Sequence, residues 1–78
     1  MQKRTFKVLL ERDADDGVWV TTVPALDGLS TYGETREKAI EQTREAILGY
    51  LEAAQREGLP VPAGSTEIEL LDVEVAPA

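Results

Sequence analysis

Residues 35–58 read Thr-Arg-Glu-Lys-Ala-Ile-Glu-Gln-Thr-Arg-Glu-Ala-Ile-Leu-Gly-Tyr-Leu-Glu-Ala-Ala-Gln-Arg-Glu-Gly, and this stretch decides the fold. Its apolar or small residues recur at steps of three and four, which places them on one face of a helix: Ala39, Ile40, Thr43, Ala46, Ile47, Tyr50, Leu51 and Ala54. The Thr35 hydroxyl can cap the first turn, and Gly58 followed by Pro60 suits a helix end. We therefore predict an amphipathic helix of about 22 residues.

Two strands are predicted before this helix. Thr5–Arg12 alternates between apolar and more polar positions, and Val18–Val23 is almost entirely β-branched or aromatic. The segment between them, Asp13–Gly17, has the composition of a turn, so the two strands should form an antiparallel hairpin. In the first strand, one face should hold Phe6, Val8 and Leu10, and the other Lys7, Leu9 and Glu11.

Two more strands complete the predicted sheet. Pro24 ends the second strand, and Leu26–Tyr32 can form a short third one before Gly33. Thr66–Val75 alternates again, with a change of phase at Leu70–Leu71 that a β-bulge would accommodate. The expected fold is α+β: one domain over residues 1–78, ordered β-β-β-α-β, with an antiparallel sheet and one long helix packed on one face.

A single helix covers only one side of such a sheet. If Phe6, Val8 and Leu10 face the helix, Leu9 points away from it, together with either Trp19 or the pair Val18 and Val20. Apolar side chains on an uncovered face often indicate a protein–protein contact. The alternative is a scatter of ordinary exposed apolar residues.

Composition limits the possible functions. A chain of 78 residues has a thin core, and with no cysteine and no histidine it has neither disulfides nor a Cys/His zinc site to stabilise it, so association with another chain is expected. The net charge is −7, although residues 1–12 carry about +3. The acidic remainder disfavours direct binding of nucleic acid and favours a basic protein partner, unless the acidity serves solubility alone. Because no segment resembles a signal peptide or a membrane span, we expect a cytoplasmic location and no membrane partner.

Catalytic signals are weak. Asp13, Asp15, Asp16 and Gly17 resemble the start of a calcium loop, but the remaining ligands are missing, and a solvated turn explains the same residues. Without histidine or cysteine the commonest catalytic bases and nucleophiles are absent. We predict that the protein is not an enzyme and binds no cofactor; a metal-dependent RNA-processing activity at the aspartate cluster is a distant alternative.

A series of short motifs resembles the HicB antitoxin family. Pro24-Ala25-Leu26-Asp27-Gly28 is similar to the family's Pro-Asp-Leu-Pro-Gly, and Gly33-Glu34-Thr35 leads into Arg36-Glu37-Lys38-Ala39 as the family's Gly-Asp/Glu-Thr leads into its helix. The helix exit, Glu57–Pro62, is also similar. The chain departs from the family pattern at Ala25, Asp27 and Leu29, where aspartate, proline and cysteine are usual.

The resemblance implies a partial RNase-H-like fold, self-association, and occlusion of a small basic HicA-type toxin that cleaves mRNA. Because the chain ends at Ala78 after its last predicted strand, we do not expect the operator binding that a further DNA-binding segment provides. Trp19 and Tyr32 are the candidate partner-binding anchors, because aromatic residues dominate interface hot spots, although Trp19 is an equally good core residue. The alternative function is an orphan homo-oligomeric module, structural or ligand-binding, with no toxin partner.

Overall fold

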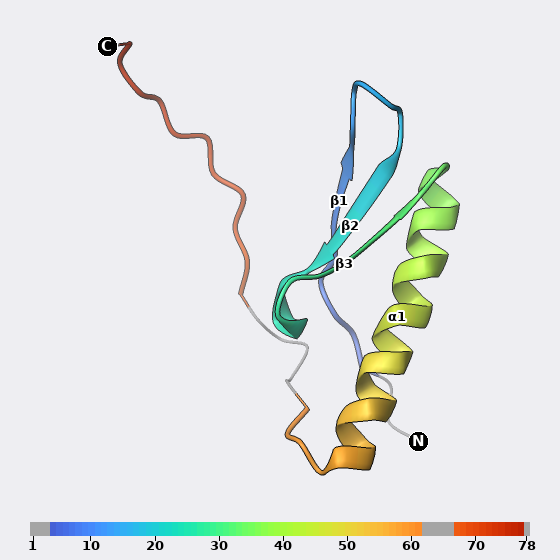
Figure 1. Ribbon diagram of the computed structural model, residues 1–78. Coiled ribbons are helices and arrows are strands. Elements are labelled where there is room, and N and C mark those ends of the chain that lie inside the picture. The colour runs from blue at the N-terminus through green and yellow to red at the C-terminus, as the bar shows by residue number, and fades with distance from the viewer. Residues whose placement is uncertain (1–3, 62–66, 78) are drawn as a thin grey trace.

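The computed structural model describes residues 4–61 and 67–77. Three antiparallel strands form one sheet in the order β1-β2-β3, and the single long helix packs on one face of it, against β3 and β2 (Figure 1). The elements are β1 (Leu9–Arg12), β2 (Trp19–Val23), the 3-10 turn η1 (Pro24–Leu26), β3 (Leu29–Gly33) and α1 (Arg36–Glu57). The predicted α+β class is confirmed, whereas the likeness to an RNase-H-like domain remains a prediction.

Helix α1 has the predicted bounds and caps. It spans 22 residues, and the Thr35 side chain accepts a hydrogen bond from the Lys38 amide at 3.1 Å. At the other end Gly58 has a φ of 69°, a left-handed conformation that glycine adopts without steric cost. The amide of Leu59 then donates to the Ala54 carbonyl at 2.8 Å, which satisfies one of the carbonyls left free by the last turn.

The hairpin forms as predicted, but its first strand is shorter than expected. β1 begins at Leu9, which pairs with Thr22, and residues 4–8 lie outside the strand. β2 ends at Val23 because Pro24 has no amide hydrogen to donate and the chain turns there into η1. In this register Val8 lies opposite Val23, the last residue of β2, and residues 4–7 extend past the end of that strand.

The core lies between β2, η1 and α1. Its fully buried apolar residues are Val23, Leu26, Ala39 and Ala54. Leu26, the predicted start of the third strand, instead belongs to η1, and β3 begins only at Leu29. Asp27 takes a left-handed φ of 58° between the two and turns the chain back along β2.

Two close contacts join the strands to the helix. Gly33 is buried at the end of β3, and a Cβ atom there would lie 2.5 Å from the backbone nitrogen of Ala39, so only glycine fits. Farther along, the hydroxyls of Thr21, Thr31 and Thr43 hydrogen-bond to one another, with Thr31 Oγ1 2.7 Å from both of the others. Thr43 also donates to the Ala39 carbonyl at 2.9 Å, so the buried hydroxyl groups are paired.

The predicted fourth strand, Thr66–Val75, is wrong for the residues that the structure describes. Residues 67–77 form no strand, and Leu70, Leu71, Val73 and Val75 are 73–83% exposed. A strand is stable only when a neighbouring strand accepts and donates its backbone hydrogen bonds. Apart from Ile68 and Leu70, which line a shallow hollow with residues 7–9, this segment runs away from the sheet (Figure 1). The proposed β-bulge at Leu70–Leu71 consequently has no ladder in which to form. We call residues 67–77 the tail.

Candidate interaction surfaces

The register of the sheet assigns each residue to a face. Leu10 pairs with Thr21, and Thr21 contacts Thr43 of α1, so these positions face the helix. Leu9 pairs with Thr22 on the opposite face, as predicted. The helix-free face holds Leu9, Glu11, Val20, Thr22, Ser30 and Tyr32. Half of these residues are apolar or aromatic, so the face is mixed rather than uniformly polar.

Tyr32 is the most prominent group on the helix-free face. It pairs with Val20, which pairs with Glu11, and the three make one cross-strand row, which we call the tyrosine row. The Tyr32 side chain is 72% exposed, whereas Val20 is half-buried. An exposed aromatic ring on an edge strand is accessible to a partner and is well placed to insert into it.

Trp19 lies on the other face. It is one residue from Val20, so it points to the helix side, where it is half-buried beneath Arg12 with the guanidinium carbon 5.9 Å from the ring centroid. The two candidate anchors therefore lie on opposite faces of the sheet, and one flat partner surface cannot contact both of them.

Carboxylates surround the end of the sheet that carries the tyrosine row. The β1–β2 turn contributes the exposed Asp13, Asp15 and Asp16, and Glu34 follows β3 at the same end. The Asp15 amide donates to Asp13 Oδ1 at 2.9 Å, and the Gly17 amide to the Asp13 carbonyl at 2.8 Å, which is ordinary turn chemistry. Among residues 4–61 and 67–77, no three carboxylates converge in a way that could hold a metal ion.

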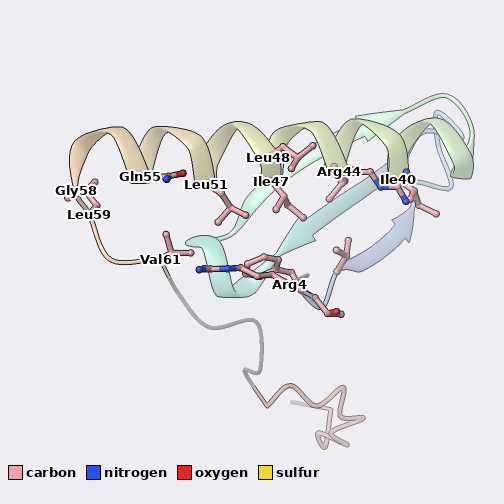
Figure 2. A pocket seen from close by; sticks show the side chains of 14 residues that line it. Arg4, Ile40, Arg44, Ile47, Leu48, Leu51, Gln55, Gly58, Leu59 and Val61 are labelled. Carbon is pink, nitrogen blue, oxygen red and sulfur yellow. The ribbon is translucent and has the colours of Figure 1, made fainter. Parts of the chain in front are cut away.

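An apolar groove of about 990 Å³ lies between α1 and the N-terminal segment. Figure 2 shows Ile47 and Leu51 pointing from the helix toward Arg4 and Val61 across the groove. Phe6 and Val8, which were predicted to face the helix, also line it. Residues 4–8 belong to no strand, and Val8, Leu48 and Leu59 are exposed along the groove.

Tyr50 of α1 is tied to the turn before β3. Its hydroxyl donates to Asp27 Oδ2 at 3.3 Å. Burial raises the pKa of Tyr50, and the nearby charge of Asp27 and the hydrogen bond to it raise this pKa further. The contact holds the residue that follows η1 against the helix.

Sequence reasoning missed two of these features. Thr43 was counted as a member of the apolar stripe, and nothing in its helical spacing shows that its hydroxyl meets Thr21 and Thr31. The signal available was three threonines at helix-facing positions, a buried set that needs mutual hydrogen bonds. The groove was missed because Thr5–Arg12 was expected to pair along its full length.

No helix in the described part of the chain combines the length and apolarity needed to cross a membrane.

Comparison with known proteins finds one matching family model and several similar proteins. The family model described as HicB-like antitoxin of bacterial toxin–antitoxin systems matches residues 6–75. A UPF0150 protein of Thermoplasma acidophilum is 34% identical over 62 residues, covering 80% of this chain and 88% of its own. Two UPF0150 proteins of Synechocystis are 39% identical over 57 residues (73% of this chain, 81% of theirs) and 36% identical over 70 residues (90% and 87%). The family match includes the tail up to residue 75.

Proposed function

Because the chain belongs to the HicB-like antitoxin family, we propose that it binds and occludes a small basic mRNA-cleaving toxin of the HicA type. Family membership itself supports an antitoxin role and a toxin partner of some kind. The observation that carries the finer proposal is the tyrosine row, an exposed aromatic side chain on the helix-free face with carboxylates around it.

Electrostatics favour a basic partner at this end of the molecule. The chain carries a net charge of −7, and Glu11, Glu34 and the aspartates of the β1–β2 turn lie toward the same end of the sheet as Tyr32. An RNA-cleaving protein needs a positive surface for its substrate. An acidic surface attracts that positive surface, accelerates the encounter and competes with the RNA phosphates.

Tyr32 supplies the apolar contact that charge alone does not provide. Charged groups at the rim of an interface mainly set the rate of association, and buried aromatic anchors set the lifetime of the complex. When a partner covers a ring that is 72% exposed, much apolar surface is removed from contact with water. No transition state has to be stabilised, since the proposed mechanism is occlusion.

The test is co-expression with the protein encoded beside this chain's gene, with copurification and rescue of growth as readouts. We expect both for the native chain, and we expect Tyr32→Ala to weaken binding by about 30-fold or more, since hot-spot residues contribute about 2 kcal/mol or more. Leu59→Ala, which also truncates an exposed apolar side chain but at the far end of α1, should bind like the native protein. Unchanged binding by Tyr32→Ala, or no binding by the native chain, would contradict the proposal.

A second reading is an orphan homo-oligomeric module, structural or ligand-binding, that has no toxin partner. The exposed apolar tail and the open groove favour self-association in either case, and we propose that the protein is an oligomer. An oligomer that binds no neighbouring gene product would support this second reading over the antitoxin.

A further inference from the structure

We infer that two copies of this chain exchange their tails, and that residues 67–75 of each copy add as a strand to the free edge of β1 in the other. The inference deepens the self-association proposed above and does not depend on binding of a toxin.

The tail has the side chains of a buried strand in a setting with nothing to bury them. Leu70, Leu71, Val73 and Val75 are among the most exposed large apolar residues that the structure describes. Glu67, Glu69, Asp72 and Glu74 are interleaved with them, which is the pattern of a strand rather than of a solvated linker. The radius of gyration is 15.1 Å, whereas a compact domain of this length has about 12 Å. The tail is therefore an arm suited to pack on another surface.

The β1 edge is the receptive surface. Of the described strands only β2 pairs with β1, so the outer edge of β1 presents unpaired backbone donors and acceptors. Residues 4–7 continue the chain along this edge beyond the end of β2. An added strand would place alternate side chains beside Val8 and the mouth of the groove, and the others beside Leu9 on the helix-free face. The tail has apolar residues at both even and odd positions, so as an added strand it would present apolar side chains on both faces of the sheet. The β1 edge also has an apolar residue on each face.

Charge complementarity selects this edge. The described residues of the N-terminal segment include Arg4, Lys7 and Arg12, against Glu11 alone, whereas the tail contains four acidic residues and no basic residue. The opposite edge, β3, has no basic residue between Leu29 and Gly33 and is followed by Glu34. An acidic tail is therefore attracted to β1 and repelled from the end of β3.

The path of the tail favours a second copy over its own sheet. Ile68 and Leu70 still line a shallow hollow with Lys7, Val8 and Leu9 of the same chain. Beyond this point the tail leaves its own sheet (Figure 1), and Leu71, Val73 and Val75 remain at least 73% exposed. Two chains related by a two-fold axis can each provide one edge and one tail, which closes the assembly and leaves neither group unpaired.

Engineered cysteines test the exchange directly, because the native chain has none. One tagged chain carries Lys7→Cys, and an untagged chain carries Glu69→Cys, Leu71→Cys or Val73→Cys, three tail positions of one parity. The two proteins are mixed, left to exchange subunits and oxidised mildly. We expect a disulfide-linked heterodimer with at least one tail position. The matched control is Glu52→Cys, an exposed acidic position on α1, which should give no such product.

Two further measurements separate the possible failures. A chain carrying both Lys7→Cys and the reactive tail cysteine should form covalent dimers. A fast-migrating monomer with an internal disulfide would overturn the exchange by showing that the tail pairs with its own sheet.

Light scattering of the Leu71→Lys, Val73→Lys double variant should show dimerisation weakened about tenfold or more. If this variant remains a full oligomer, self-association stands and tail exchange is wrong. If the native chain is a monomer at high micromolar concentration, both are wrong.

Discussion

The region between β2, β3 and α1 and the region around the β1 edge differ in how completely their groups find partners within the described chain. Between β2, β3 and α1, Gly33 allows the helix backbone to approach closely and the hydroxyls of Thr21, Thr31 and Thr43 hydrogen-bond to one another. No buried side-chain polar atom of the described residues lacks a hydrogen-bond partner. At β1 no described strand pairs with the outer edge, the groove is open, and the large apolar side chains of the tail are exposed. We call these the closed seam and the open edge. The difference fits the proposal that a second polypeptide completes the open edge.

The largest expected effect is at the closed seam. Gly33→Ala would place a methyl group against the Ala39 backbone, which cannot move without displacing α1, so we expect a loss of about 3 kcal/mol in the free energy of unfolding. The control is Gly49→Ala, in mid-helix with nothing within 4 Å of the added atom, which should gain up to about 1 kcal/mol. Urea denaturation measures both. Equal effects of the two substitutions would refute the tight helix–strand contact.

A matched pair of valines compares the two regions directly. Val23→Ala removes fully buried methyl groups and should cost about 2 kcal/mol. Val73→Ala, in the tail, should change the stability of dilute monomer by less than about 0.5 kcal/mol, and should weaken self-association at higher protein concentration. Thermal melts over a range of concentrations separate the two effects. A melting temperature of the Val73→Ala variant that falls equally at every concentration would mean that the tail packs within its own chain.

The threonine cluster gives an intermediate effect. Thr43→Val keeps the shape of the side chain but removes the hydroxyl that bonds to Thr21 and Thr31, so we expect a loss of about 1–2 kcal/mol. Thr22→Val on the helix-free face, where no hydrogen bond joins the threonine side chain to another described residue, should be nearly neutral. If the two variants are equally stable in urea, the hydroxyl cluster contributes nothing.

Local signals in the sequence are sufficient for the helix of the closed seam, but not for its threonine cluster or for the open edge. The bounds of α1 follow from Thr35, the apolar stripe and Gly58, because capping and helical period are properties of neighbouring residues. The length of β1 depends on Pro24, which is distant in sequence from the residues it leaves unpaired. The tail has the composition of a strand, but composition cannot say which edge, or which chain, provides its hydrogen bonds. The assignment of Trp19 and Tyr32 as anchors stays a prediction, and the register adds that they face opposite ways.

The smallest effect concerns Tyr50 and pH. The raised pKa of Tyr50 means that the folded state disfavours its ionised form. Its contribution to stability is therefore complete below the pKa of an unfolded tyrosine, about 10, and is lost as the pH rises toward the higher folded value. Tyr50→Phe should be less sensitive to alkaline pH than the native protein. Absorbance titration of the phenol group and denaturation at several pH values check this; an identical alkaline loss in both proteins would exclude Tyr50 as its source.

Hydrogen exchange of the native protein as a function of concentration tests most directly whether a second chain completes the open edge. At high micromolar concentration we predict slow exchange for the amides of residues 67–75 and for the outward-facing amides of β1, and fast exchange of both after dilution, while α1 and β2 stay protected throughout. Tail amides that exchange at the unprotected rate at every concentration would contradict the proposal that the tail pairs with the β1 edge of a second chain.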